Sequence, residues 1–181
     1  MAESITNSVD CCIEQIKSSA VAAFAQDVEL PMGLILDEVE IRAKNVAWED
    51  GFSLANPAEA LVRISEARLQ AFVASQLPPM VYNLQVRYAE GLILATASLR
   101  FVFEVKATAH LAPEIFDSQS LHLKLVKFDG PSIARSILES QIVQRNPVFE
   151  ASSLPMSITL DRVAVGEMLE LAGTVSVSGA S

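Results

Sequence analysis

The feature that most constrains the fold of this chain is an unbroken alternation of apolar and polar residues over positions 91–111. Every odd position from Ile93 to Leu111 is apolar, whereas only three of the ten even positions from Leu92 to His110 are. Successive side chains of a strand point to opposite faces of its sheet, so period-two alternation predicts β-structure with one buried face. The stretch is therefore expected to be one strand, or two strands in one register.

The length of this stretch adds a second constraint. A single strand over it would be about 66 Å long at roughly 3.3 Å per residue, far beyond the usual strand. No Gly, Pro, Asn or Asp occurs from Leu92 to Leu111, so the usual signals of a hairpin are missing. The pattern predicts either a long sheet that curls or an unmarked bend near residues 96–98.

The remaining segments resemble strands and helices in turn. Alternation predicts strands at residues 34–46, 58–64, 82–88, 121–128, 157–165 and 168–177. Apolar residues spaced by three or four predict amphipathic helices at residues 5–24, 65–77 and 132–145. A loop is expected at residues 113–118, and Asp129 could cap the third helix, with Pro131 tolerated in its first turn.

Short connections between consecutive strands favour antiparallel pairing. We therefore predict an α+β fold in which a long, strongly curved, mostly antiparallel sheet wraps one or more amphipathic helices. With 181 residues, 51% of them hydrophobic, the chain is expected to form a single domain over residues 1–181. It would comprise an N-terminal helix (1–26), the sheet with two further helices (27–177) and a frayed tail (178–181).

Charge and cysteine content limit the partners and the compartment. A net charge of −9 argues against nucleic acid, because phosphate binding needs clustered Lys and Arg. Cys11 and Cys12 are the only cysteines, and adjacent cysteines build no disulfide framework. The first residues lack the basic start and apolar core of a signal peptide, and no uncharged apolar window reaches eighteen residues. A cytoplasmic location is expected, and an envelope location stays open if the natural chain begins earlier.

No constellation of catalytic or metal-binding residues emerges. His110 and His122 occupy polar positions of alternating strands, and zinc would need three or four ligands in matched geometry. The sequence contains no Gly-x-Ser-x-Gly elbow, no phosphate-binding glycine loop and no His-Glu-x-x-His motif. We therefore expect no enzyme activity, no cofactor and no metal site.

The apolar face of residues 91–111 remains as the candidate binding surface. The small residues Ala95, Ala97, Ala107 and Ala109 flank bulkier ones on this face. In a curved sheet they would leave room for an acyl chain, or they would let a helix approach closely. The expected lining residues, from this face and from the helix at 132–145, are Leu99, Phe101, Phe103, Val105, Ile133, Ile137 and Leu138.

Three motifs in order resemble a known family. Residues 57–73 (PAEALVRISEARLQAFV), 127–131 (KFDGP) followed by a helix, and 154–160 (LPMSITL) running into a closing hairpin resemble the LmeA-like phospholipid-binding domains of bacteria. The resemblance covers residues 34–177. It implies a relative of the tubular lipid-binding proteins, in which a long curved sheet wraps a helix and holds lipid tails. Such proteins often carry an export or membrane signal, which is not seen here.

Two functional hypotheses follow. In the first, the protein binds phospholipid or another long apolar ligand without catalysis, in a groove between curved sheet and helices, with peripheral membrane contact as a further expectation. In the second, the same apolar surface takes no ligand and buries against another protein or a second copy of the chain, forming a homodimer.

Overall fold

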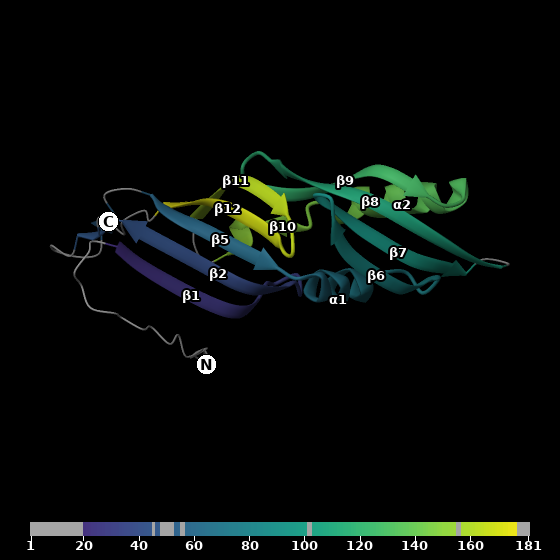
Figure 1. Cartoon of the computed structure of the whole chain (residues 1–181), viewed down its shortest axis with the longest axis horizontal. Helices are drawn as coiled ribbons and strands as arrows, with labels where there is room; N and C mark the ends of the chain where they lie inside the picture. Colours follow the sequence, from purple (N-terminus) through teal and green to yellow (C-terminus); the bar gives the residue numbers. More distant parts are fainter. Residues whose placement is uncertain are drawn as a thin grey trace, which may run out of the picture.

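The computed structural model describes residues 20–44, 46–47, 53–54, 57–100, 103–154 and 157–176, and it has an α+β fold. The described strands form two five-stranded sheets in which every pairing is antiparallel (Figure 1). The first sheet has the order β1 (Ala20–Glu29), β2 (Ile35–Lys44), β5 (Ala58–Ile64), β12 (Leu169–Ser176) and β11 (Ser157–Val165). The second has the order β10 (Phe149–Glu150), β9 (Ser120–Asp129), β8 (Glu104–Phe116), β7 (Leu92–Arg100) and β6 (Val81–Ala89). The short strands β3 (Val46–Ala47) and β4 (Ser53–Leu54) pair with each other.

The predicted class, a curved antiparallel sheet with helices, is confirmed, although the strands divide between two sheets. The second sheet curls strongly into half a barrel (Figure 1). Its pairings shift register between Tyr82 and Gln85 and between His110 and Leu111. Such irregularities bend a strand and increase its twist, so they favour curling of the sheet.

The long alternating stretch is a hairpin of two strands, β7 and β8. Ile93 pairs with Leu111 and Arg100 pairs with Glu104, so the chain reverses between Arg100 and Glu104, whereas residues 96–98 lie within β7. Both strands keep the odd positions on one face because the register pairs odd residues with odd ones. The missing turn residues explain why the alternation alone could not place the bend.

Strand β8 also continues through the predicted loop at residues 113–118 as far as Phe116, which corrects that prediction. Its pairing with β7 ends at Leu111, and beyond this point β8 pairs with β9 alone. Pro113 has no backbone N–H group to donate. It is tolerated there because β8 pairs with a strand on one side only beyond Leu111.

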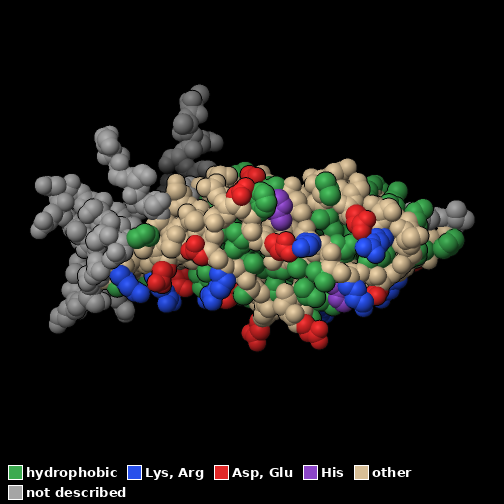
Figure 2. Space-filling model, turned by 90° about the horizontal axis from the view of Figure 1, so that it is seen from above, with side chains coloured by type: hydrophobic (Ala, Val, Ile, Leu, Met, Phe, Trp, Pro, Cys, Tyr) green, Lys and Arg blue, Asp and Glu red, His purple; other side chains and the backbone are tan. Residues whose placement is uncertain are grey.

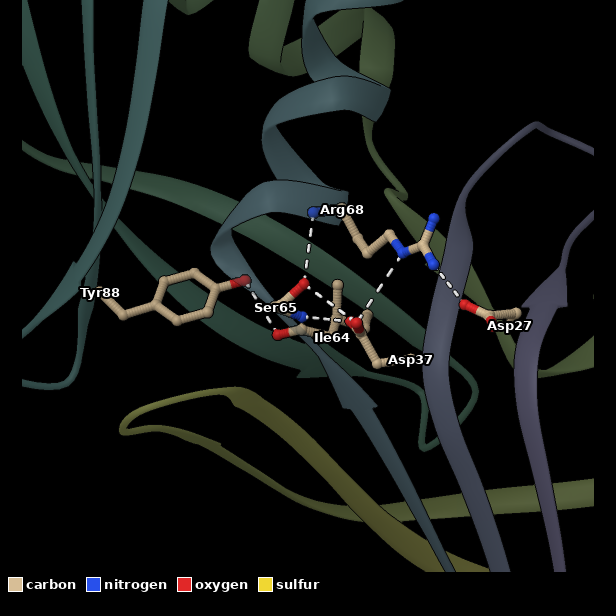
Figure 3. A network of polar contacts seen from close by, with 6 residues as sticks. All are labelled: Asp27, Asp37, Ile64, Ser65, Arg68 and Tyr88. Atoms are coloured by element: carbon tan, nitrogen blue, oxygen red, sulfur yellow. Dashed lines mark hydrogen bonds and ion pairs between the residues drawn. The ribbon is translucent and has the colours of Figure 1, made fainter.

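Helix α1 (Glu66–Gln76) begins directly after β5, as predicted, and its start is fixed to the first sheet. The Ser65 hydroxyl accepts a hydrogen bond from the Arg68 backbone N–H at 3.4 Å. Asp37 of β2 accepts hydrogen bonds from the Ser65 backbone N–H at 2.6 Å and from the Ser65 hydroxyl at 3.1 Å. Arg68 also pairs with Asp27 of β1 (Figure 3). These contacts orient α1 at the boundary between the two sheets.

Helix α2 (Ser132–Arg145) confirms the predicted range, but Asp129 does not cap it. The cap residue is Pro131, which makes no side-chain hydrogen bond to the helix. Asp129 ends β9 instead, where its carboxylate lies 2.9 Å from Lys127 Nζ and 3.2 Å from His110 Nε2.

The predicted N-terminal helix is wrong at its C-terminal end. Residues 20–24 belong to strand β1, which pairs with β2 from Ala20 to Glu29. The alanine-rich segment suits a helix by propensity, but pairing with β2 outweighs this weak preference. Residues 1–19 of the predicted helix, and the predicted tail, lie outside the described residues.

One hydrophobic core runs through both sheets. It contains buried residues of the first sheet, such as Leu36 and Leu171, and of the second, such as Ile93 and Leu121. The backbone N–H of Leu160 in β11 also donates to the carbonyl oxygen of Ser118, after β8, at 2.7 Å. The two sheets therefore contact each other directly, in addition to being joined by the connecting segments of the chain.

Candidate ligand-binding cavity

A hollow lies between the curled second sheet and the two α helices. The cavity itself is about 150 Å³, and the wider hollow, counting the part that is open to solvent, is about 1110 Å³. The wall is almost entirely apolar: it comprises Leu69, Phe72, Val73, Gln76, Leu77, Val81, Leu84, Val86, Ile93, Ala95, Ala97, Leu99, Ala107, Ala109, Leu111, Leu123, Phe128, Ala134, Ile137, Leu138, Gln141, Ile142, Arg145, Asn146 and Val148. Binding sites for small apolar molecules are concave and have this kind of lining.

Each helix contributes one face to the wall. The wall residues of α1 and its end are Leu69, Phe72, Val73, Gln76 and Leu77, and those of α2 are Ala134, Ile137, Leu138, Gln141, Ile142 and Arg145. Both sets recur at intervals of three and four residues, which places them along a single stripe of a helix. The α2 stripe extends about 17 Å at a rise of 1.5 Å per residue. The hollow is thus elongated along α2.

Four alanines form the floor of the cavity on the hairpin of β7 and β8. Ala95 pairs with Ala109, and Ala97 pairs with Ala107, so the four small side chains form a compact block on one face. The neighbouring pair on one side is Ile93 with Leu111. Because a methyl group is the whole side chain at four adjacent positions, the sheet leaves space here that larger residues would fill.

At one end of the cavity the sheet and α2 are in direct contact. Ala134 in the first turn of α2 is only 2% exposed and packs with Leu99 and Ala107. A side chain at Gly130 would come within 2.9 Å of the Ala107 methyl group, which is closer than ordinary packing allows. The small residues therefore allow a helix to approach at Ala107, while they leave open space farther along the floor.

The opposite end carries the polar residues of the wall. Arg145 Nη1 donates to Gln76 Oε1 at 2.6 Å, and Arg145 Nη2 donates to the backbone carbonyl of Gln76. The Asn146 side chain donates to the Leu123 carbonyl and accepts from the Leu123 N–H, both at 2.9 Å. Gln141 Oε1 is buried and has no hydrogen-bond partner within the described part of the chain. The cavity therefore has an apolar length and a polar end.

The structure brings three of the seven predicted lining residues into the wall: Leu99, Ile137 and Leu138. Val105 pairs with Leu99 and is half-buried, but it lies nearer the hairpin tip and outside the wall. Phe103 at the tip is 70% exposed, and Ile133 in the first turn of α2 is 58% exposed. Phe101 lies outside the described residues.

Sequence reasoning missed the contribution of α1 and the polar end of the cavity. Leu69, Phe72, Val73 and Leu77 were recognisable as an apolar stripe, but a stripe of this kind indicates burial and not which cavity it faces. Gln141 lies between Leu138 and Ile142 on the predicted apolar face of α2, and this interruption is the signal that could have revealed the polar end.

The two histidines do not meet in the structure. His110 Nε2 lies 3.2 Å from Asp129 Oδ2, whereas His122 Nε2 lies 3.1 Å from the Ser120 hydroxyl. Within the described ranges, no group of three or more His, Cys, Asp or Glu side chains could hold a metal ion.

Charged pairs lie on the surface of both halves of the molecule. On the first sheet, Arg63 bridges Glu38 and Glu170, and Lys44 pairs with Glu59; on the second, Lys124 pairs with Glu114. Figure 2 shows charged side chains along the length of one face, with hydrophobic side chains between them. None of the described helices is both long enough and apolar enough to cross a membrane.

Comparison of the chain with protein-family models, with curated proteins and with solved structures found no match. Functional interpretation therefore depends on the cavity itself.

Proposed function

We propose that this protein binds the alkyl part of a lipid, or another long apolar molecule, in the cavity between its second sheet and its two helices, without catalysis. The observation that carries the proposal is the alanine floor, Ala95, Ala97, Ala107 and Ala109, beneath an apolar wall. The resemblance to LmeA-like domains leads to the same class of ligand.

The chemistry of the cavity wall supports this proposal. The cavity itself, about 150 Å³, is smaller than the about 300–1,000 Å³ typical of pockets for small ligands, so a long chain would also occupy the open part of the hollow. Transfer of each CH₂ group from water to such a wall contributes about 0.8 kcal/mol. A long alkyl chain therefore gains enough from burial to bind, even with few polar contacts.

A substitution in the floor tests the proposal. Ala97→Leu adds three carbon atoms where a ligand would lie, so two or three CH₂ groups of the ligand lose their place. At about 0.8 kcal/mol each, affinity for an uncharged long-chain polyene, followed by its fluorescence, should fall about ten-fold or more. The matched control is Ala164→Leu, because Ala164 is exposed on β11 of the first sheet and remote from the cavity wall.

Wild-type protein and the Ala164→Leu variant should bind the probe equally. Absence of binding by the wild-type protein, together with absence of organic-extractable lipid after purification, would contradict the proposal. Equal affinity of the Ala97→Leu and wild-type proteins would place the ligand elsewhere.

A further inference from the structure

The polar end of the cavity contains an arginine whose charge has no acidic partner within the part of the chain that the structure describes. Arg145 is the one charged residue among the described residues of the wall, and no carboxylate of the described chain lies within ion-pair distance of it. Its observed partners are the side-chain and backbone oxygens of Gln76, both of which are neutral. A guanidinium has five N–H donors, and these bonds engage two of them.

The contrast with the rest of α2 is clear. Arg135, near the start of the same helix, pairs with Glu139 at 2.8 Å and does not belong to the cavity wall. Arg145 belongs to the cavity wall, and its bonds to Gln76 leave the other N–H groups of its guanidinium unengaged. Charge-assisted hydrogen bonds from arginine favour phosphate and carboxylate oxygens, because the planar guanidinium matches their geometry.

Gln141 provides a second, independent indication at the same end. It lies four residues before Arg145, hence one turn away on the same helix face. Its Oε1 atom is buried and has no hydrogen-bond partner among the described residues, which costs free energy unless a donor reaches it. Arg145 therefore offers free donors to whatever occupies this end of the cavity, and rotation of the neighbouring Gln141 side chain would bring its unsatisfied acceptor within reach.

We infer that the ligand of this cavity is an amphiphile whose head carries an anionic phosphate or carboxylate group bound by Arg145, one helical turn from Gln141. The inference rests on the proposed function, because it assumes that an alkyl chain fills the apolar length. The alkyl chain would lie along the α2 stripe toward Ala134, and the head would lie between the C-terminal ends of α1 and α2.

The alternative at this position is a cationic head. The last backbone carbonyls of a helix carry partial negative charge, so the C-terminal end of α2 alone would favour a cation. The full positive charge of Arg145 at the same end opposes it. The two electrostatic effects therefore predict opposite preferences, which a binding experiment can separate.

The experiment compares four ligands that share one alkyl chain length and differ in the head: phosphate, carboxylate, alcohol and trimethylammonium. The wild-type protein should bind the two anionic ligands at least ten-fold more tightly than the alcohol, and the trimethylammonium ligand most weakly. The Arg145→Gln variant should lose the anionic preference while its affinity for the alcohol stays within about two-fold. The Arg145→Lys variant should keep part of the preference because it keeps the charge.

Arg135→Gln is the matched control, since it removes a positive charge from the same helix outside the cavity wall. It should bind all four ligands like the wild-type protein. Should Arg145→Gln fail to fold, two other measurements test whether Arg145 binds the anionic head. The Arg145→Lys variant should keep part of the preference for anionic ligands, and the wild-type preference should weaken as salt rises, because the open end of the cavity is screened.

The outcomes separate the two proposals. Equal binding of all four ligands by the wild-type protein, or an unchanged anionic preference in Arg145→Gln, would overturn the inference and leave lipid binding intact. Failure of every ligand to bind would overturn lipid binding itself, and with it the role of Arg145.

Discussion

Tyr88 links the two sheets through a single side chain. It lies on β6 of the second sheet, and its hydroxyl donates to the carbonyl oxygen of Ile64, the last residue of β5 in the first sheet, at 3.2 Å (Figure 3). Its backbone N–H donates to Glu66 Oε1 at 2.6 Å. Burial, aided by the negative charges of Glu66 and Asp37, raises the pKa of the Tyr88 hydroxyl well above its ordinary value.

This shift predicts a loss of stability in alkaline solution. The unfolded chain releases the tyrosine proton near pH 10, whereas the folded chain retains it to higher pH. The contribution of Tyr88 to the free energy of unfolding is therefore fully present below pH 10 and is lost progressively as the pH rises above that value. The free energy of unfolding, measured by urea denaturation at pH 8 and above pH 10, should fall across this interval.

The two tyrosines of the chain allow a controlled comparison. In a Tyr82→Phe background, only Tyr88 contributes tyrosinate absorbance, and its ionisation should begin well above pH 10. Adding Tyr88→Phe should lower stability at pH 8 by about 1 kcal/mol through the lost hydrogen bond, and should flatten the alkaline decline. Ionisation of Tyr88 near pH 10 in the folded protein would contradict the assignment.

Single residues also show what could be predicted from sequence. Ser65, the first residue of the helix predicted at residues 65–77, caps that helix in the structure, and a local rule suffices for capping. Asp129 fitted the same local rule and failed, because Lys127 on its own strand and His110 on the neighbouring strand β8 engage its carboxylate. Arg145 could not be recognised at all, because its significance depends on which described carboxylates lie near it in three dimensions, and none of them lies within ion-pair distance.

Among the elements, the hairpin of β11 and β12 shows how tightly two strands can pack. A side chain on Gly173 of β12 would lie 2.2 Å from the backbone oxygen of Thr159 in β11. The register shift between Leu160 and Arg162 occurs opposite this glycine. The backbone of β11 thus occupies the space in which a Cβ atom would lie.

Gly173→Ala should therefore destabilise the protein by about 1–3 kcal/mol, because a strand backbone must move to admit the methyl group. Gly166, in the turn of the same hairpin, offers the control: a Cβ there would meet nothing within 4 Å. Gly166→Ala should leave stability unchanged or raise it by about 0.4–1 kcal/mol. Urea denaturation of the two variants measures both effects, and equal stability of both would show that β11 shifts at no cost.

The elements that sequence predicted best have strong local patterns. Strand β5, helix α1 and helix α2 each show one clear periodicity between capping or breaking residues. Strand β1 shows none, because its described residues are largely exposed and its strand conformation comes from pairing with β2. Division of the strands between two sheets also depends on long-range pairing, such as that of β5 with β12, which adjacent residues do not encode.

At the scale of the whole molecule, the shared core predicts cooperative unfolding. Leu171 of β12 is 1% exposed in a cluster that extends into the second sheet. Leu171→Ala should lower the free energy of unfolding by about 2–5 kcal/mol, and both sheets should lose stability together. Pulsed hydrogen exchange at increasing urea should show the same shift in midpoint for peptides from β12 and from β8.

The control is Val126→Ala on β9, because Val126 is largely exposed and its truncation should change neither midpoint appreciably. A lowered midpoint confined to the first sheet in Leu171→Ala would mean that the sheets unfold as two domains. The predicted single domain over residues 1–181 would then be wrong.

The candidate site, like the shared core, is built from elements that lie far apart in the sequence. Its floor was visible in the sequence as an alternating stretch with four alanines, and the sequence left open whether they make room or admit a helix. Both occur, at different points of one surface, because α2 touches the sheet at Ala107 and Ala134 and leaves the rest of the floor free. That arrangement depends on how far α2 lies from the sheet along its length, which no local pattern specifies.

The alanine floor has a consequence for how such a protein can diverge. An alanine codon becomes a valine codon by one base change, and each such change narrows the cavity by two carbon atoms without disturbing the hairpin register. Four adjacent positions therefore give natural selection a graded means of altering which chains fit. Descendants of one ancestral gene could acquire different ligands while they keep the same helices, the same sheet and the same polar end.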